Sequence, residues 1–343
     1  MTELLHILET AINAVIPVVL LVLLGYRLKQ SGSLTKEFVK VGNKFCFNVA
    51  IPCMVFINVY NIENFARIRW DVVIYSTVML LVLFGMGLIT AVLTTKVAER
   101  RGVILQVTFR SNMAILGLSL ASVLGGDEAV AVAAIVSAVS LPVLNILVVL
   151  SLSIFVNRGE GDKIDILGIL KNIAKNPMII GIFLGMLCLL VRGLQQRYLG
   201  EVVFALSNQL KFFYSTLNNI KSMASPLALV ILGAQFEFSS SKGMLKEIVV
   251  GTVWRIVLAP LIGIGVAILL SKFTPLLNFG VNEYPSLVAL FGTPAAVTSA
   301  IMAEQMKNDA QLATQLVVWT SILSIATMFL MVCLLMAGGF LAV

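Results

Sequence analysis

The stretch FRSNMAILG, residues 109–117, decides the fold of this chain because it sets three polar residues inside a membrane-length apolar run. Arg110, Ser111 and Asn112 stand side by side about halfway along that run. A helix that crosses a bilayer needs about 20 mostly apolar residues, and a charge near its centre is costly. The triplet therefore predicts a break in a membrane helix that serves a site.

The whole chain is apolar enough to predict a membrane protein. Of its 343 residues, 59% are hydrophobic and 12% are charged, and the mean hydropathy is +1.01. Soluble domains carry about 25% charged residues. A soluble core cannot bury this much apolar surface, so the predicted fold class is an all-α polytopic membrane protein in a lipid bilayer. The net charge of +7 is explained by basic cytoplasmic loops, and no basic run with interleaved aromatics indicates nucleic acid.

Several classes of function are excluded by the residue types present. The only histidine is His6, near the start of the sequence, so a zinc-protease helix, a Ser–His pair or a histidine proton relay is not expected. The cysteines lie in apolar segments without CxxC spacing, so neither a metal site nor a disulfide is predicted; they are Cys46, Cys53, Cys188 and Cys333. We therefore expect no enzyme, no cofactor and no metal.

Hydropathy predicts ten membrane-spanning helices. They cover residues 6–28, 36–59, 70–95, 101–124, 127–157, 176–193, 208–235, 245–271, 283–306 and 309–341. Lys and Arg are concentrated in the loops that follow the odd-numbered helices. By the positive-inside rule, both termini are predicted to lie outside a cell inner (plasma) membrane.

The two halves of the chain resemble each other. A shift of 182 residues places FRSNMAILGLSLASVLGGDEAVAVAAIV (109–136) over FGTPAAVTSAIMAEQMKNDAQLATQLVV (291–318) without a gap. Phe109 then matches Phe291, and Asp127 matches Asp309. Five helices in each half force the second copy to enter the membrane from the opposite side. We expect a 5+5 inverted repeat, with copies at 1–157 and 176–343 joined by an amphipathic linker at 158–175.

The break in the ninth helix is predicted within LFGTPAAVTSA, residues 290–300. Gly292 permits unusual dihedral angles, Thr293 can cap a helix, and Pro294 suits a first helical turn. A half-helix is therefore expected to start at Thr293 and to leave the amides of Ala295 and Ala296 free.

The matching residues in the fourth helix are Ser111 as the cap and Asn112 after it. Helix-break or crossover residues are also predicted at Gly117, at Gly292, and at Pro52 and Pro226 in the second and seventh helices. Two half-helix N-termini that face each other would make an anion site. The alternative is that each break is a kink satisfied by neighbouring helices.

Other polar residues in the apolar segments leave two interpretations open. Arg110 would contact a substrate or pair with backbone carbonyls, and Arg255 would be structural or bind. Asn48, Asn145 and Gln235 would line a cavity or bridge helices by hydrogen bonds. Lys44 and Lys221 are expected to extend toward a membrane interface. The acids lie near predicted helix ends, so the coupling ion is left open among proton, sodium and none; they are Glu9, Glu128, Glu283, Glu304 and Asp309.

Seven stretches resemble the auxin efflux carrier (AEC) family, bacterial permeases related to the plant PIN auxin exporters. They are LLGYRLKQSGSLT (23–35), FNVAIPCMVF (47–56), FRSNMAILGLSL (109–120), SLPVLNILVVLSL (140–152), LKNIAKNPMIIGIFLGML (170–187), SPLALVILGAQF (225–236) and TPAAVTSAIMAEQMKND (293–309). The resemblance implies a scaffold of helices 1, 2, 6 and 7, an elevator-type transport domain of the others, and crossover helices 4 and 9 beside the substrate. It also suggests a homodimer. Asn112 stands where the second crossover has Pro294, so the first crossover lacks a proline at its break.

The leading hypothesis is a secondary transporter, or permease, for a small organic anion. The substrate would be a mono- or dicarboxylate, malate-like or auxin-like, carried by an elevator alternating-access mechanism. The predicted substrate-binding residues are Asn112, Ser111, Arg110, Thr293, Pro294, Asn48 and Asn145. The alternative is an anion channel or a ligand-binding membrane sensor. A channel needs a continuous polar path, whereas the polar groups concentrate at two breaks, which favours alternating access.

Overall fold

The computed structural model describes residues 2–61, 69–155, 174–237, 243–274 and 277–341, and their regular structure is helical apart from one isolated bridge. The long helices are α1 (Thr2–Gln30), α4 (Trp70–Thr94), α6 (Leu118–Ile154), α8 (Pro177–Leu199), α10 (Lys211–Gln235) and α15 (Ala310–Ala337). The shorter ones are α2 (Lys36–Phe45), α3 (Ile51–Tyr60), α5 (Ala98–Phe109), α9 (Leu206–Gln209), α11 (Leu245–Val253), α12 (Ala259–Phe273), α13 (Tyr284–Leu287) and α14 (Thr298–Gln305). Of the linker predicted at 158–175, only residues 174 and 175 lie within the described part.

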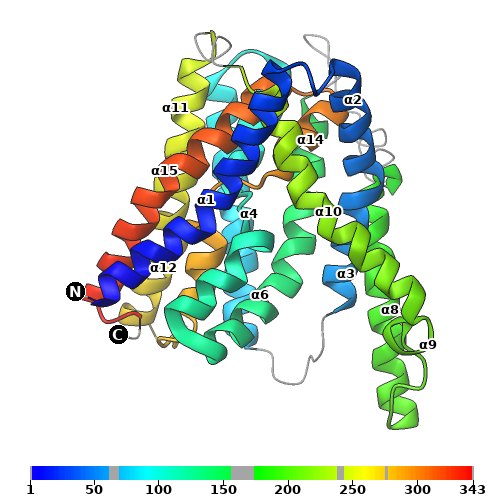
Figure 1. Ribbon diagram of the computed structural model, residues 1–343. Coiled ribbons are helices and arrows are strands. Elements are labelled where there is room, and N and C mark those ends of the chain that lie inside the picture. Colours follow the sequence, from blue (N-terminus) through cyan, green and yellow to red (C-terminus); the bar gives the residue numbers. More distant parts are fainter. Residues whose placement is uncertain (1, 62–68, 156–173, 238–242, 275–276, 342–343) are drawn as a thin grey trace.

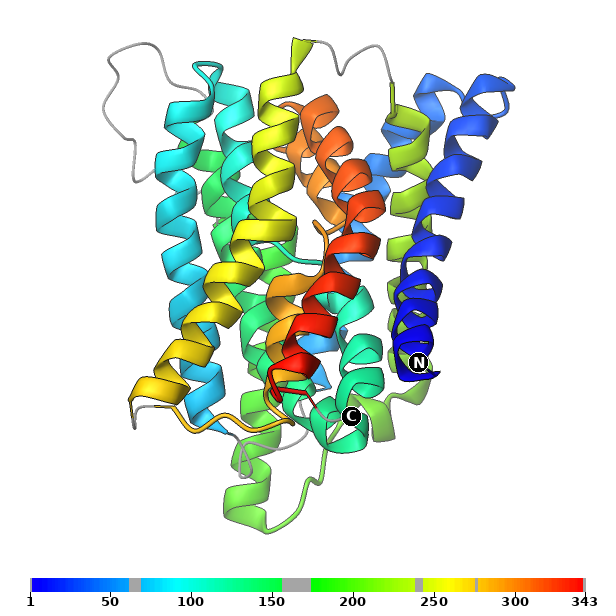
Figure 2. The same cartoon turned by 90° about the vertical axis from the view of Figure 1, so that its left-hand side faces the viewer.

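The helices form a bundle whose long members run roughly along one direction (Figures 1 and 2). Six stretches are long and apolar enough to cross a membrane, namely Lys36–Tyr60, Trp70–Thr94, Leu120–Ile154, Pro177–Leu199, Leu245–Phe273 and Ala310–Ala337. Large apolar side chains face outward along these helices, such as Leu93 at 75% exposure and Phe183 at 66%. An all-α polytopic membrane protein is thus confirmed, while the ten-span inverted repeat stays a prediction.

Four five-residue π-helical segments, η1 (Cys46–Ala50), η2 (Met113–Gly117), η4 (Trp254–Leu258) and η5 (Val288–Gly292), interrupt or extend the α-helices. Two of them precede a proline by the same spacing: η1 ends two residues before Pro52, and η4 ends two residues before Pro260. A proline ring clashes with the carbonyl four residues earlier and offers no N–H. The wider π turn at that carbonyl lets the helix continue through the proline.

Close helix pairs hold one side of the bundle together. On α1 and α10, a Cβ added at Gly25 would lie 2.0 Å from the carbonyl oxygen of Val230, and one added at Gly233 would lie 1.9 Å from that of Val22. On α8, a Cβ at Gly181 would lie 2.7 Å from the carbonyl oxygen of Pro52 in α3. Small residues allow backbones to approach this closely in membrane proteins. The pairs α1–α10 and α3–α8 are therefore fixed by glycines.

Candidate functional site

The chain is broken at two places, and the two breaks cross each other. α5 ends at Phe109 and η2 begins at Met113, while η5 ends at Gly292 and α14 begins at Thr298. Between them, residues 111 and 295 pair in an isolated antiparallel bridge. The N–H of Asn112 donates to the carbonyl oxygen of Pro294 at 2.8 Å. The polar triplet at 110–112 thus lies against the interrupted segment of the other half.

The second break differs from the predicted one. The half-helix begins at Thr298 rather than Thr293, whose φ of −74° and ψ of 152° are extended. These angles would suit a helix cap, but Ala295 pairs with Ser111 in the bridge, so the segment after Pro294 stays extended and the helix starts only beyond it. The Thr293 hydroxyl donates back to the carbonyl of Ala289 at 2.9 Å. The Ala295 N–H, expected to be free, donates to Thr320 Oγ1 at 3.2 Å.

The predicted helix-break residues divide into two groups. Gly292 ends η5, and Pro294 follows it within the second break. Gly117 has helical angles, φ −63° and ψ −50°, so the first break lies ahead of it, at Arg110–Asn112. Pro52 lies in the first turn of α3, and Pro226 lies inside α10, and both helices continue. Proline at a first turn, or after a wide turn, does not interrupt the chain.

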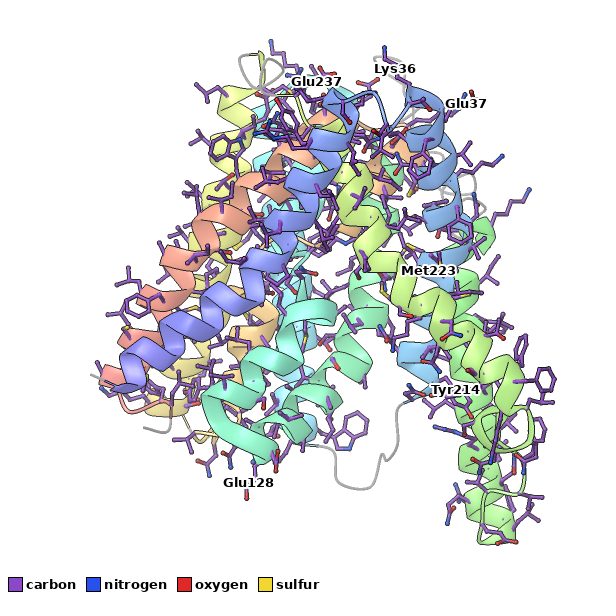
Figure 3. The ribbon with its side chains drawn as sticks, in the orientation of Figure 1. Lys36, Glu37, Glu128, Tyr214, Met223 and Glu237 are labelled. Atoms are coloured by element: carbon purple, nitrogen blue, oxygen red, sulfur yellow. The ribbon has the colours of Figure 1, made fainter. Side chains whose placement is uncertain are left out.

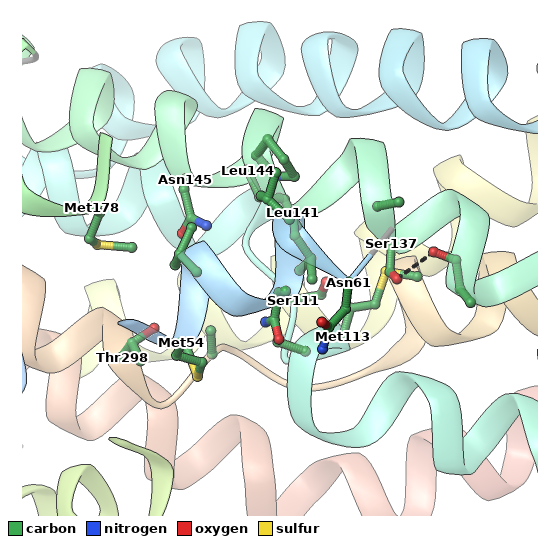
Figure 4. A pocket seen from close by; sticks show the side chains of 18 of the residues that line it. Met54, Asn61, Ser111, Met113, Ser137, Leu141, Leu144, Asn145, Met178 and Thr298 are labelled. Atoms are coloured by element: carbon green, nitrogen blue, oxygen red, sulfur yellow. Dashed lines mark hydrogen bonds between the residues drawn. The ribbon is translucent and has the colours of Figure 1, made fainter. Parts of the chain in front are cut away.

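A cavity of about 610 Å³ opens beside the breaks, between α3, α6, α8 and α10. Most of its wall is apolar, including Met113, Leu141 and Met178 (Figure 4). Its polar residues are Asn58, Asn61, Arg110, Ser111, Ser137, Asn145, Lys221 and Thr298. A volume of this size is ordinary for a small-molecule site, which combines apolar walls with a few placed polar groups.

The charge on this cavity wall is positive. Arg110 is only 3% exposed, and its guanidinium donates to Thr298 Oγ1 at 2.6 Å, to Gln106 Oε1 at 3.3 Å and to Met302 Sδ at 3.0 Å. All three partners are neutral, and the four ion pairs among the described residues do not involve Arg110 or Lys221. No Asp or Glu is among the described residues of the lining. A buried cation without a counter-ion is costly, so this cavity favours an anion.

Two polar groups at the first break have no partner. The hydroxyl of Ser111 and the side-chain nitrogen of Asn112 are buried and make no hydrogen bond. Ser111 faces the cavity, whereas Asn112 lies 2% exposed outside its lining. Unpaired buried polar groups cost about 1–3 kcal/mol each. Such groups beside a cationic cavity are suited to bind a ligand.

The structure brings together only some of the predicted binding residues. Arg110, Ser111 and Asn145 line the cavity, and Thr293 and Pro294 are buried outside the lining. Asn48 is exposed, and its side-chain nitrogen donates to the carbonyl of Lys44 at 2.9 Å. The π turn that accommodates Pro52 carries Asn48 away from the cavity.

Sequence reasoning missed five polar lining residues. Ser137 and Thr298 were not considered, and Lys221, expected to extend toward an interface, lines the cavity instead. Asn58 and Asn61 stand at i and i+3 at the end of the apolar helix α3, a spacing that places both on one face. That spacing was the available signal for them.

Arg255 is the other buried arginine among the described residues. It is 0% exposed and donates to the carbonyl oxygen of Phe291, near the end of η5. Its Nε and Nη1 make no hydrogen bond, and it is absent from the cavity lining. This placement favours the structural interpretation. Among the described residues, no group of three or more His, Cys, Asp or Glu could hold a metal ion.

Comparison with known proteins identifies the chain's relatives. The family model described as "Membrane transport protein" matches residues 10–332. The chain is also similar to a protein named "Uncharacterized transporter" from Methanothermobacter thermautotrophicus, at 25% identity over 326 residues that cover 92% of this chain and 95% of the relative. Both matches extend over nearly the whole chain, and both descriptions name transport.

Proposed function

The chain belongs to the membrane transport protein family, that of the auxin efflux carriers, and on this premise we propose that it is a secondary transporter for a small organic anion. The observation that carries the proposal is the 610 Å³ cavity with Arg110 and Lys221 in its wall and no acid among its described lining residues. A guanidinium matches the geometry of a carboxylate and can donate two parallel hydrogen bonds to it. The apolar wall would contact the hydrocarbon part of a mono- or dicarboxylate, malate-like or auxin-like.

The transport mechanism is alternating access of the elevator type. The static scaffold consists of α1, α2–α3 and α8–α10, and the remaining helices move against it. The cavity supports this division because α3, α8 and α10 form one wall, and α6 with the two breaks forms the other. A substrate bound there lies at the boundary between the two groups of helices.

Ion pairs support the same division. Arg69, just before α4, contacts Glu283 at 2.6 Å, and Arg100 on α5 contacts Glu247 on α11 and Asp309 at the start of α15, both at 3.0 Å. Every one of these residues belongs to the proposed moving group. Side chains tied by ion pairs at both ends of the bundle would keep that group rigid as it moves.

The 5+5 inverted repeat accounts for the scaffold packing. Under the repeat, α1 corresponds to α8 and α3 corresponds to α10, so the pair α1–α10 maps onto the pair α8–α3. These are the two pairs that glycines bring into close approach. The same repeat relates the two breaks, which form one antiparallel bridge. In the cell, the protein would lie in the inner membrane with the Lys36 end of the bundle in the cytoplasm, by the positive-inside rule.

The test is counterflow in liposomes that contain the purified protein, with labelled malate, malonate, lactate and indole-3-acetate. We expect saturable counterflow of at least one of these anions and no counterflow of an uncharged analogue. Flux without counterflow would indicate a channel, and binding without flux would indicate a sensor. Lys221→Gln distinguishes the substrate classes. If Arg110 and Lys221 both bind one substrate, this change should weaken the binding of a dicarboxylate more than the binding of a monocarboxylate.

A further inference from the structure

A second polar cluster, away from the cavity, joins the two groups of helices. Glu304 on α14 lies against α2 and α10 near the Lys36 end of the bundle (Figures 1 and 3). The side-chain amides of Asn43 on α2 and Gln235 on α10 both donate to the same oxygen, Oε2, of Glu304. None of the ion pairs among the described residues involves Glu304. It is a half-buried carboxylate held by neutral groups alone.

The amides that donate to this carboxylate have unpaired oxygens. Asn43 is 0% exposed, and its Oδ1 makes no hydrogen bond. Gln235 Oε1 is likewise buried and unpaired. Gln311 on α15 donates through Nε2 to the Gln235 carbonyl at 3.1 Å, and its own Oε1 is also buried and unpaired. Buried polar atoms in native proteins nearly always have a partner, so unpaired oxygens on both amides that contact Glu304, and on the adjoining Gln311, indicate a ligand site.

We propose that Glu304, Asn43 and Gln235, flanked by Gln311, form a binding site for a monovalent cation of the sodium type. Carboxylate and amide oxygens are hard ligands that suit hard cations. One negative charge among neutral amides matches a single positive charge. Glu304 lies in the last turn of α14, where the partial negative charge of the helix end also favours a cation.

The amide groups provide two consistent arrangements of the site. Without a cation, the NH2 groups of Asn43 and Gln235 face the carboxylate. An amide has donor and acceptor ends of nearly equal size, so a half turn of each side chain would present its oxygen to a cation held by Glu304. The same turn would satisfy the oxygens that are unpaired in the structure.

The position of the site couples cation binding to movement. Asn43 and Gln235 belong to the proposed scaffold, and Glu304 and Gln311 belong to the proposed moving group. A cation that binds all of them stabilises this relative position of the two groups over others. This coupling rests on the proposed transport function, whereas binding of the cation does not.

The test of binding is the thermal stability of the purified protein in sodium, potassium or choline chloride at equal ionic strength, with binding of labelled sodium measured directly. The wild type is expected to bind sodium and to gain a saturable rise in Tm. Glu304→Gln and Asn43→Leu, which keep the side-chain size, should lose both. Glu128→Gln is the matched control: Glu128 lies at the opposite end of the bundle from Lys36 (Figure 3), and among the described residues its side chain accepts from Asn282, so the response should persist.

Sodium binding that is unchanged in Glu304→Gln, or absent from the wild type, would overturn the proposal. So would a Tm that follows pH and not sodium, since it would assign Glu304 to a proton. A separate measurement, uptake driven by an imposed sodium gradient, tests the coupling. Sodium binding without transport of any anion would refute the proposed function and leave the cation site standing. Anion transport without sodium binding would refute the cation site and leave the proposed function standing.

Discussion

The two breaks cross each other and differ in chemistry. The first covers residues 110–112 and precedes η2, the second covers residues 293–297 and follows η5, and they pair through Ser111 and Ala295. The first break presents Arg110 and Ser111 to the cavity. In the second break, Thr293 is 0% exposed, and its hydroxyl is used by the backbone.

The two buried arginines show the same difference. Arg110 reaches from the first break to Thr298 and the cavity wall, and Arg255 reaches from η4 to the carbonyl of Phe291 at the second break. Both breaks form the crossing, but the polar residues that a break itself contributes to the cavity wall, Arg110 and Ser111, belong to the first. The first break is the place to look for substrate specificity, and the second for support.

The largest effect is expected from removing the charge of Arg110. Arg110→Met should lower the affinity for the transported anion by about 3 kcal/mol, roughly a hundredfold, because it removes a desolvated charge-assisted contact. Folding should persist, since replacing a buried charge by an apolar side chain of similar length is often neutral or stabilising. The measurement is the concentration dependence of counterflow.

Arg255→Met is the matched control because Arg255 is as deeply buried but lies outside the cavity. Its KM should stay within about twofold of the wild-type value, a change near the size of experimental scatter. Equal losses of affinity in the two variants would show that the arginines act alike and that the contrast between the breaks is wrong.

A smaller effect is expected from the support of the second break. Thr320→Val should lower the free energy of unfolding by about 2 kcal/mol because it leaves the buried N–H of Ala295 without its acceptor. Thr314→Val on the same helix is the control: Thr314 Oγ1 is buried and unpaired, so its loss should be neutral or stabilising. Unfolding of both variants in detergent measures the difference, and equal losses would refute the supporting role of Thr320.

Much of this arrangement could be predicted from the sequence, for physical reasons that also set the limit. Apolar run length predicts helices, and a polar triplet in such a run predicts a break, because both follow from the cost of burying polar groups in lipid. Both breaks are present in the structure. Which face of a helix a residue occupies depends also on local turns. Asn48 lies in the π segment before Pro52 and is exposed, and the pattern of apolar residues does not reveal a π segment.

Contacts between residues far apart in the chain could not be predicted from the sequence, for a different reason. Lys221 lies far along the chain from Arg110, so one cavity with two cations cannot be read from either segment. Glu304 was placed near a helix end, which is correct, but its contact with Asn43 joins residues 261 positions apart. Pairing at that separation is decided by how the helices pack.

The next effect tests the hydroxyls of the two breaks. Ser111→Ala should raise KM by about fivefold, equivalent to about 1 kcal/mol, because it removes an unpaired hydroxyl that faces the cavity. Thr293→Val removes the hydroxyl at the second break, which donates to Ala289 rather than to the cavity. Its KM should be unchanged. A rise in KM for Thr293→Val alone would place the substrate at the second break.

The smallest effect concerns the turns that follow the half-helices. The turn after the first break uses Gly126 with φ 62°, and the turn after α14 uses Lys307 with φ 59°, one position before the residue that the 182-residue shift pairs with Gly126. The Lys307 N–H donates to the carbonyl of Glu304 and the next N–H to that of Ala303, the two bonds of a helix end that glycine usually occupies. A side chain makes the left-handed region less favourable. Lys307→Gly should therefore raise the unfolding free energy by about 0.5 kcal/mol, after the extra chain entropy of glycine is subtracted.

Lys40→Gly provides the comparison for this change, because Lys40 is an exposed lysine in the middle of α2. Glycine in a helix interior costs about 1 kcal/mol, so the two lysine-to-glycine changes should shift the unfolding free energy in opposite directions. If both destabilise the protein, the left-handed angle at Lys307 carries no strain. The turns of the two halves would then be equivalent in energy, and the difference between the halves would be confined to the crossing itself.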